Sequence, residues 1–342
     1  MASPADDRQR YRAPVWLPGG HAQTIYASLR SHAAPVRYRR TRWDTPDGDF
    51  IDLDWVDPPP DDPQSHRPLL ALFHGLEGSS RSHYALALMD VAVRQGLRGV
   101  VVHFRGCSGE INAKPRAYHS GDSAEIDWVL RRLRAEVPDV PLHAAGVSLG
   151  GNALLKWLGE QGAAAGEVLA SAAAISAPLD LMAAGDALGE GLNMIYTRMF
   201  LATMKRKILA KLARFPGIVD AAAVHRSRTL REFDDIVTAP LHGFRDTDDY
   251  WTRASSKPWL PRIAIPTLVL NARNDPFLPA RALPSPTEVA AAVTLEYPET
   301  GGHVGFLSPP FPGAQGWLPG RILGFLQGAA GHDRNAASRT DD

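Results

Sequence analysis

Five short runs of the chain are almost entirely apolar, and segments with helical periodicity lie between several of them. Continuous apolar strands are typical of a parallel sheet that is covered on both faces. The predicted strands cover residues 69–75, 99–104, 141–148, 168–176 and 266–272. The segments HYALALMDVAVRQG, SAEIDWVLRRLRAEV and GNALLKWLGEQG repeat their apolar residues at the spacing of a helix face. This alternation predicts an α/β fold with a mostly parallel central sheet and helices on both faces.

The beginning of the sheet follows a different pattern. Residues 36–43 and 50–57 alternate apolar and polar positions on either side of the turn-forming sequence TPDGD. Such a pair predicts an antiparallel hairpin. We therefore expect a mixed sheet, with this hairpin ahead of the parallel strands.

The strand pattern stops between about residues 178 and 258, and helical patterns replace it. An insertion of this length between two strands predicts a helical cap over the edge of the sheet. A helix expected over about residues 192–215 contains three of the six methionines, and no acidic residue occurs from Gly191 to Val219. Two interpretations stay open: a solvated basic face of the cap, or a surface that meets lipid or an anionic substrate.

Composition narrows the class of protein. The 342 residues are 44% hydrophobic, which is enough for one large core. With 37 basic and 37 acidic residues the formal net charge is zero, so no global charge favours a nucleic acid partner. The single cysteine, Cys107, excludes an internal disulfide and any metal site with several cysteines. We expect Cys107 to be a small buried residue.

The ends of the chain are polar. The first fourteen residues, MASPADDRQRYRAP, lack the apolar core of a signal peptide, and no run of eighteen apolar residues occurs. We expect a flexible N-terminus at 1–12, a single α/β domain at 13–328 and a disordered tail at 329–342. A cytoplasmic protein without stable membrane insertion follows from this pattern, with peripheral lipid contact left open. The oligomeric state is not predicted.

The sequence GVSLG at residues 146–150 is a candidate nucleophile elbow. It follows an apolar strand and opens a helix, so Ser148 would stand on a strained turn at the end of the strand. Gly146 and Gly150 would let the strand and the helix pass closely. The alternative is a glycine-rich turn in which Ser148 only caps the helix.

A serine nucleophile needs a base, and the elbow fold places an acid and then a histidine after the serine. Asp275 follows the predicted strand 266–272, and only His303 and His332 come later in the sequence. His332 lies in the polar tail, which leaves His303, in a glycine-rich segment that we expect to be mobile. We predict Asp275 and His303 as partners of Ser148; the acids Asp234, Asp235 and Asp248 lie in the expected cap and fit less well.

The developing negative charge of an acyl-transfer reaction needs hydrogen-bond donors. We predict the backbone N–H groups of Leu149, directly after the nucleophile, and of Leu76, in the loop HGLEG after an earlier strand. Gly75 would stand beside Leu76, and His74 would support the loop from behind. On its own, HGLEG is equally typical of a simple turn at the end of a strand.

Several segments together resemble the YheT-like α/β-hydrolases, relatives of yeast medium-chain ethyl ester synthases/esterases and of animal abhydrolase-domain lipases. They are APVWLPGGHAQTIYASL, HGLEGSSRSHY, HFRGCSGEINAKPRAYHSG, GVSLGGNALLKWLGE, YWTRASS and NARNDPFLP, in that order, and the resemblance covers about residues 13–328. The catalytic serine, aspartate and histidine of that family match Ser148, Asp275 and His303.

The resemblance implies a serine carboxylesterase that acts on short- to medium-chain acyl esters, with monoacylglycerols among the candidate substrates. We expect no metal and no organic cofactor, and an acyl chain that lies beneath the methionine-rich cap. Two alternatives remain: an acyltransferase that makes esters from an activated acyl donor and an alcohol, and a binding scaffold without catalysis. Fold resemblance does not separate them, because function resides in the site.

Overall fold

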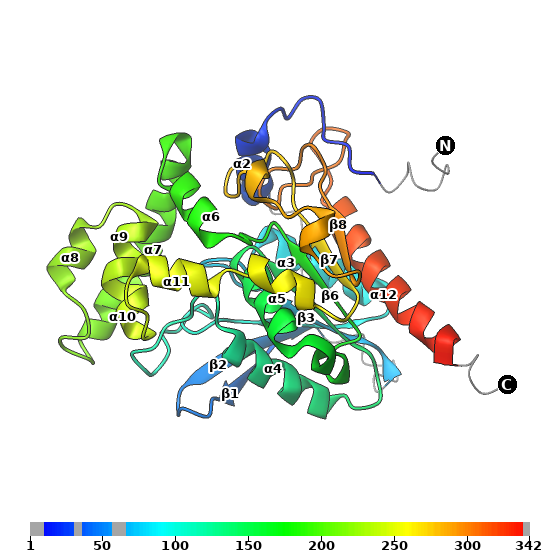
Figure 1. Ribbon diagram of the computed structural model, residues 1–342, viewed down its shortest axis with the longest axis horizontal. Coiled ribbons are helices and arrows are strands. Elements are labelled where there is room, and N and C mark those ends of the chain that lie inside the picture. The colour runs from blue at the N-terminus through cyan, green and yellow to red at the C-terminus, as the bar shows by residue number, and fades with distance from the viewer. Residues whose placement is uncertain (1–9, 31–35, 57–65, 338–342) are drawn as a thin grey trace.

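The computed structural model describes residues 10–30, 36–56 and 66–337. Within them, eight strands form one sheet in the order β1-β2-β4-β3-β5-β6-β7-β8 (Figure 1). The strands are β1 (Arg39–Asp44), β2 (Phe50–Val56), β3 (Leu69–Phe73), β4 (Arg98–Val102), β5 (Leu142–Val147), β6 (Ser171–Ile175), β7 (Thr267–Leu270) and β8 (Val293–Glu296). The short strand β8 has no counterpart in the predicted set.

The sheet is mixed, as the sequence predicts. Strand β2 pairs antiparallel with β1 and with β4, and every other neighbouring pair is parallel. The parallel strands bring their carboxyl ends to one edge of the sheet. In a parallel sheet of this kind, that edge is where ligands bind.

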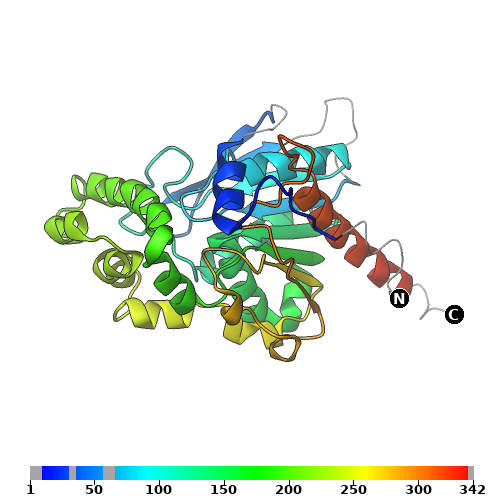
Figure 2. The same cartoon turned by 90° about the horizontal axis from the view of Figure 1, so that it is seen from above.

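Helices cover both faces of the sheet. Helices α3 (His83–Arg94) and α12 (Trp317–Ala337) pack on one face, and α4 (Ser123–Glu136) and α5 (Leu149–Gln161) pack on the other (Figures 1 and 2). Alternate residues of one strand serve the two apolar layers: Ala71 and Phe73 belong to the layer under α4 and α5, and Leu72 belongs to the layer under α3 and α12. This explains why the parallel strands are apolar at every position.

Between β6 and β7 the chain leaves the sheet and forms a helical cap with its own apolar core, which appears at one side of the sheet in Figures 1 and 2. Its helices are α6 (Leu181–Leu188), α7 (Met194–Leu212), α8 (Ala221–Arg226), α9 (Leu230–Phe233), α10 (Ala239–Leu241) and α11 (Thr247–Ala254). A π-helical segment, Asp234–Thr238, joins α9 to α10. Insertions of this kind inside α-helices occur often at functional sites.

The described structure begins before residue 13 and continues past residue 328, which are the predicted limits of the domain. Tyr11, expected in a flexible terminus, is 7% exposed, and its hydroxyl donates to the Leu307 carbonyl at 2.9 Å. Its ring packs against Phe306 and Trp317, so burial of an aromatic ring holds this segment in place. Helix α12 continues to Ala337 through the alanine-rich stretch GAAGHDRNAA, into the expected tail. Residues 1–9 and 338–342, also predicted to be disordered, lie outside the described residues.

A helix that the sequence pattern did not reveal, α2 (Gly20–Leu29), lies at the carboxyl edge of the sheet. It is only weakly amphipathic, and two polar residues, Gln23 and Thr24, are among its buried side chains. Buried polar side chains must find hydrogen-bond partners. Those partners belong to the candidate site.

Candidate active site

Ser148 stands at the junction where β5 ends and α5 begins. Its backbone has φ of 52° and ψ of −120°, a strained conformation for a residue other than glycine. The side chain makes no capping hydrogen bond to the helix, which removes the interpretation of Ser148 as a helix cap. A Cβ atom on Gly146 would lie 2.5 Å from the Gly150 carbonyl oxygen, and one on Gly150 would lie 2.4 Å from the Phe73 carbonyl oxygen. The two glycines therefore let the strand and the helix meet, and that meeting presents Ser148.

The side chains of Ser148, His303 and Asp275 form one hydrogen-bonded chain. The Ser148 Oγ lies 3.0 Å from His303 Nε2, and His303 Nδ1 lies 2.9 Å from Asp275 Oδ2. With Nδ1–H donating to the carboxylate, Nε2 is left to accept the serine hydroxyl proton. The Phe277 N–H also donates to the carboxylate, and the Phe277 ring stacks on the imidazole with centroids 3.9 Å apart. The structure thus brings together the three residues that the sequence singled out.

The other acidic candidates do not reach His303. Asp234 is buried in the cap, where its carboxylate accepts hydrogen bonds from Thr238 Oγ1 and Trp251 Nε1, and burial raises its pKa to about 6. Asp235 accepts a hydrogen bond from the Thr247 N–H, and Asp248 pairs with an arginine at the surface. Asp275 contacts His303 because it lies in the loop after β7, whereas these three belong to the cap.

The loop that carries His303 is fixed by side chains from elsewhere in the chain. Four consecutive backbone N–H groups each donate to a side-chain oxygen. The pairs are Gly301 to Gln23 at 2.8 Å, Gly302 to Asn274 at 2.9 Å, His303 to Thr24 at 2.8 Å and Val304 to Ser176 at 3.1 Å. The expectation of a mobile loop does not fit this arrangement. The glycines serve close packing, since a Cβ on Gly302 would lie 2.5 Å from the Gly20 carbonyl oxygen and its φ is 60°.

Gln23 and Thr24 are the supporting residues that the sequence reasoning missed. Both belong to the segment GGHAQTIY, which contributed to the family resemblance without a role of its own. Gln23 Oε1 also accepts a hydrogen bond from Asn274 Nδ2 at 3.1 Å, so α2 binds the His303 loop and the loop before Asp275 together. The sequence signal that could have revealed this role is a pair of polar residues, Gln23 and Thr24, within a mostly apolar segment.

The HGLEG loop lies beside Ser148, and His74 supports it from the buried side. His74 is fully buried; its Nδ1–H donates to the Gly75 carbonyl at 2.8 Å, and its Nε2 accepts the Phe104 N–H at 3.1 Å. Burial, helped by the neighbouring His103, lowers the His74 pKa to about 3. A neutral imidazole with one fixed tautomer therefore supports the loop.

Backbone N–H groups near Ser148 differ in whether they have a hydrogen-bond acceptor. The Gly75 N–H donates to the Tyr84 hydroxyl at 2.9 Å. Among the described residues, the N–H groups of Leu76 and Leu149 have no hydrogen-bond acceptor, and both residues line the cavity beside Ser148. A Cβ on Gly75 would lie 3.1 Å from the Ser148 Cβ, so the loop backbone passes close to Ser148. The two unpaired N–H groups are those predicted for an oxyanion hole.

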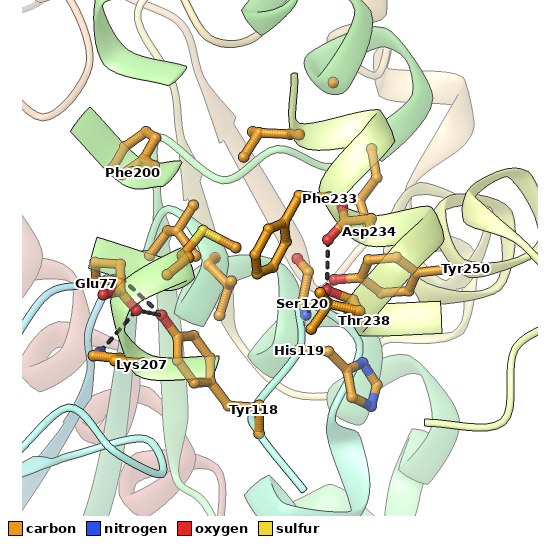
Figure 3. Close-up of a pocket in the computed structure, with 18 of the residues that line it drawn as sticks. Glu77, Tyr118, His119, Ser120, Phe200, Lys207, Phe233, Asp234, Thr238 and Tyr250 are labelled. Carbon is orange, nitrogen blue, oxygen red and sulfur yellow. Dashed lines mark hydrogen bonds and ion pairs between the residues drawn. The ribbon is translucent and has the colours of Figure 1, made fainter. Parts of the chain in front are cut away.

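The same loop is tied to the cap through Glu77 (Figure 3). Its carboxylate accepts a hydrogen bond from the Tyr118 hydroxyl and pairs with Lys207 Nζ of α7, each at 2.8 Å. The Glu77 N–H in turn donates to the Tyr118 oxygen at 2.9 Å. Glu77 has a positive φ of 56°, which three contacts to its side chain and backbone hold in place. Sequence reasoning found neither Glu77 nor Lys207.

A cavity extends from Ser148 and His303 into the cap (Figure 3). Most of its cap lining is apolar and includes Leu188, Phe200, Met204, Phe233, Val237 and Leu241. Of the three methionines of α7, Met204 lines the cavity, so the predicted methionine-rich lining is met by one residue only. Met199 points away and is 65% exposed, because the helix repeat places it on the outer face of α7. Leucine, phenylalanine and valine side chains form most of the apolar surface instead.

The remaining candidates from the sequence concern metals, membranes and the cysteine. Cys107 is buried, and burial raises the pKa of its thiol to about 11. Within the described ranges, no group of three or more His, Cys, Asp or Glu side chains is arranged to hold a metal ion. Over the same ranges, no helix combines the length and the apolar character needed to cross a membrane.

This chain is similar in sequence to proteins known from several organisms. The family described as alpha/beta hydrolase fold matches residues 68–310. The putative esterase YheT of Escherichia coli is 40% identical over 309 residues, which cover 90% of this chain and 89% of that protein. Human phospholipase ABHD3 is 32% identical, over 95% of this chain and 80% of its own length. The yeast (Saccharomyces cerevisiae) monoacylglycerol lipase is 28% identical, over 72% of this chain and 57% of its own length.

Solved structures agree at the level of the fold. The Pyrococcus furiosus esterase Pf2001 superposes with a TM-score of 0.55 at 14% identity, covering 86% of this chain and 92% of that one.

Proposed function

This chain belongs to the YheT-like α/β-hydrolases, and from that premise we propose that it is a serine carboxylic-ester hydrolase. The observation that carries the proposal is the chain of hydrogen bonds from Ser148 Oγ through His303 to Asp275, with distances of 3.0 and 2.9 Å. A binding scaffold without catalysis has no need of a strained serine that faces a fixed imidazole.

In the proposed reaction, the Ser148 Oγ attacks the carbonyl carbon of an ester while His303 Nε2 takes the hydroxyl proton. Asp275 holds the imidazole in the required tautomer and stabilises the cation that forms. The carbonyl oxygen becomes an oxyanion and accepts the N–H groups of Leu149 and Leu76.

The tetrahedral intermediate then expels the alcohol, which receives the proton from His303. A water molecule, deprotonated by the same imidazole, attacks the acyl-serine through a second intermediate. The carboxylic acid leaves, and Ser148 regains its proton. An alcohol in place of that water would give a new ester, so the acyltransferase alternative differs in the acyl donor of the first step and in the acceptor of the second.

The apolar part of the cavity is the natural place for the acyl chain. Its lining of leucine, phenylalanine and valine side chains suits a short or medium-length chain, and each buried CH₂ contributes about 0.8 kcal/mol. The relatives are described as an esterase, a phospholipase and a monoacylglycerol lipase. Hydrolysis of an ester bond is common to these three, and we propose the same reaction here, with monoacylglycerols as one candidate substrate.

The test is hydrolysis of p-nitrophenyl esters from acetate to palmitate by the purified chain. We expect butyrate or octanoate to be among the best substrates, and Ser148→Ala and His303→Ala to lower kcat by at least about a thousandfold. Equal rates for the wild type and both variants would overturn the proposed mechanism. A cytoplasmic location stays a prediction from the sequence.

A further inference from the structure

Large apolar side chains that face solvent are concentrated in one region of the surface. The described residues include eight that are exposed, and one of them, Ile111, lines the cavity. The other seven come from three segments that meet above the candidate site, and we call them the apolar face. The apolar face consists of Val15, Ile25, Leu29, Leu192, Ile195, Met199 and Phe311. Exposed apolar side chains gathered on neighbouring segments mark a site of interaction.

On the cap, the apolar face is one stripe over the first turns of α7 and the 3-10 turn Gly191–Asn193 before it. Leu192, Ile195 and Met199 are separated by three and four positions, so they project from the same side. Their exposed fractions are 67%, 48% and 65%. The opposite side of the helix buries Leu201 and Ile208 in the core of the cap. Helix α7 is thus apolar on two sides, and only one of these sides has a partner within the described residues.

Helix α2 repeats this arrangement. Ile25 and Leu29 are four positions apart and are 39% and 80% exposed, while the buried side of α2 holds the His303 loop. Val15, just before the helix, is 97% exposed, and Phe311, in a neighbouring loop, is 71% exposed. Four apolar side chains therefore point outward around a helix that is anchored from below.

The three segments adjoin one another. His21 Nδ1 of α2 lies 3.1 Å from the Tyr196 hydroxyl of α7, and the Trp16 ring contacts Phe311 edge-on with centroids 5.2 Å apart. The Tyr26 hydroxyl donates to the Pro312 carbonyl. In Figure 1, α2 lies at the top of the molecule, and Figure 2 views the same side from above, with α2 and α7 in front.

Charge distinguishes this side of the molecule. Residues 10–30, 191–219 and 304–316 contain no aspartate or glutamate, although acidic and basic residues balance over the whole chain. Arg10, Arg12 and Arg198 belong to these segments and are exposed. The carboxylates that border the three segments in sequence are Asp7 and Asp44, Glu190 and Asp220, and Glu299 and Asp333. The segments that form the apolar face thus carry exposed arginines and no carboxylate of their own.

We propose that the apolar face docks on the surface of an anionic phospholipid bilayer. Apolar side chains on short helical stripes, in segments that carry exposed arginines and no carboxylates, are features that bind the interface of such a bilayer. A second copy of the chain fits less well, because pairing this face with itself would bring arginines together. The contact would place the His303 loop, which α2 holds, directly behind the lipid-bound surface.

The test is sedimentation of the purified chain with vesicles, a readout that does not depend on ester hydrolysis. Vesicles of equal parts phosphatidylglycerol and phosphatidylcholine should retain the wild type, and pure phosphatidylcholine should retain at least tenfold less. The triple variant Leu192→Ser/Ile195→Ser/Met199→Ser should lower the partition coefficient on anionic vesicles by at least tenfold. Arg198→Gln should lower it severalfold, whereas Arg131→Gln, on the exposed side of α4, should leave it unchanged.

Thermal unfolding of each variant shows that the fold is kept, so weaker sedimentation reports the surface alone. The proposal is overturned if the wild type ignores anionic vesicles, or if the triple variant binds them as the wild type does. It is also overturned if the wild type is a dimer that ignores vesicles and that the triple variant converts to a monomer. In that case the apolar face would be a contact between copies. None of these outcomes bears on whether Ser148 hydrolyses esters.

Discussion

The hydroxyl oxygen of Thr24 accepts the backbone N–H of His303 at 2.8 Å, across 279 positions of the chain. The same hydroxyl donates its proton to the Gly20 carbonyl at 2.7 Å, which leaves its lone pairs directed at His303. The N-terminal helix α2 therefore positions the imidazole without touching the reacting atoms. This contact makes the opening segment of the chain part of the support of the candidate site.

Replacing Thr24 tests this positioning role. Thr24→Val keeps the shape but leaves a buried N–H unpaired, which costs about 1–3 kcal/mol, so we expect kcat to fall about tenfold or more with little change in KM. Thr24→Ser keeps the acceptor and should retain most of the activity. Ser28→Ala, on the exposed side of the same helix, is the matched control for α2. A Thr24→Val enzyme with wild-type kcat would mean that the loop holds its position without α2.

The Glu77–Lys207 pair should connect the stability of the cap to that of the HGLEG loop. The Glu77 side chain is 9% exposed and that of Lys207 is 29% exposed, so removing one partner strands a poorly solvated charge. We expect Lys207→Met and Glu77→Gln each to lower the free energy of unfolding by about 1–3 kcal/mol. The double variant should lose less than the sum, as measured by urea denaturation. Strict additivity would show that the two side chains do not interact.

A solvent-exposed ion pair is the control for these Glu77 and Lys207 variants. Arg131 pairs with Asp127 at 2.9 Å on α4, with side chains 46% and 30% exposed. Arg131→Met should change the free energy of unfolding by less than about 1 kcal/mol, because water screens the pair.

His74 should make the fold sensitive to mild acid. Its pKa is about 3 in the folded chain and 6.5 in a solvated imidazole, so between these values the unfolded chain binds a proton that the folded chain does not. The free energy of unfolding therefore falls by about 1.4 kcal/mol per pH unit below pH 6.5, and this contribution is fully present only above that pH.

The variant His74→Asn isolates that contribution. It should be less stable than the wild type at pH 7, because the Phe104 N–H loses its acceptor. Lacking a titrating ring, it should also lose less stability in acid, so the gap should narrow by about 2 kcal/mol between pH 7 and pH 5. Urea denaturation at the two pH values measures both quantities. A gap that stays constant would show that His74 is not held in its neutral form.

The apolar part of the cavity should control acyl chain length. Val237 is 3% exposed and lines the cavity, so Val237→Phe fills space that a longer chain would occupy. We expect kcat/KM for p-nitrophenyl octanoate to fall at least about tenfold relative to acetate, since several CH₂ groups of about 0.8 kcal/mol each lose their site. An unchanged ratio would place the acyl chain outside the cap.

The sequence predicted those features that periodicity and order encode. The parallel strands, the hairpin and the elbow follow from local patterns, and Asp275 and His303 follow from their order after Ser148. The support for His303 could not be predicted in this way, because Gln23 and Thr24 reach it from the other end of the chain. Strand β8 escaped notice because four residues, VTLE, are too short for a clear pattern.

The cap shows a second limit. Methionines in α7 suggested a methionine-lined cavity, but a helix distributes neighbouring residues around its axis. Met204 faces the cavity while Met199, five positions earlier, is exposed. Which side of α7 meets the cavity depends on how the cap packs, and Lys207 could be linked to Glu77 only once that packing was known.

The central claim is that Ser148 is a nucleophile activated by His303, and covalent labelling tests it most directly. A fluorophosphonate probe should label the wild-type chain, with mass spectrometry locating the adduct on Ser148. His303→Ala should slow labelling by at least about a hundredfold, because the hydroxyl loses its base. Ser148→Ala should not be labelled at all. Labelling of Ser148→Ala at the wild-type rate, or a wild-type adduct on any other residue, would contradict the account.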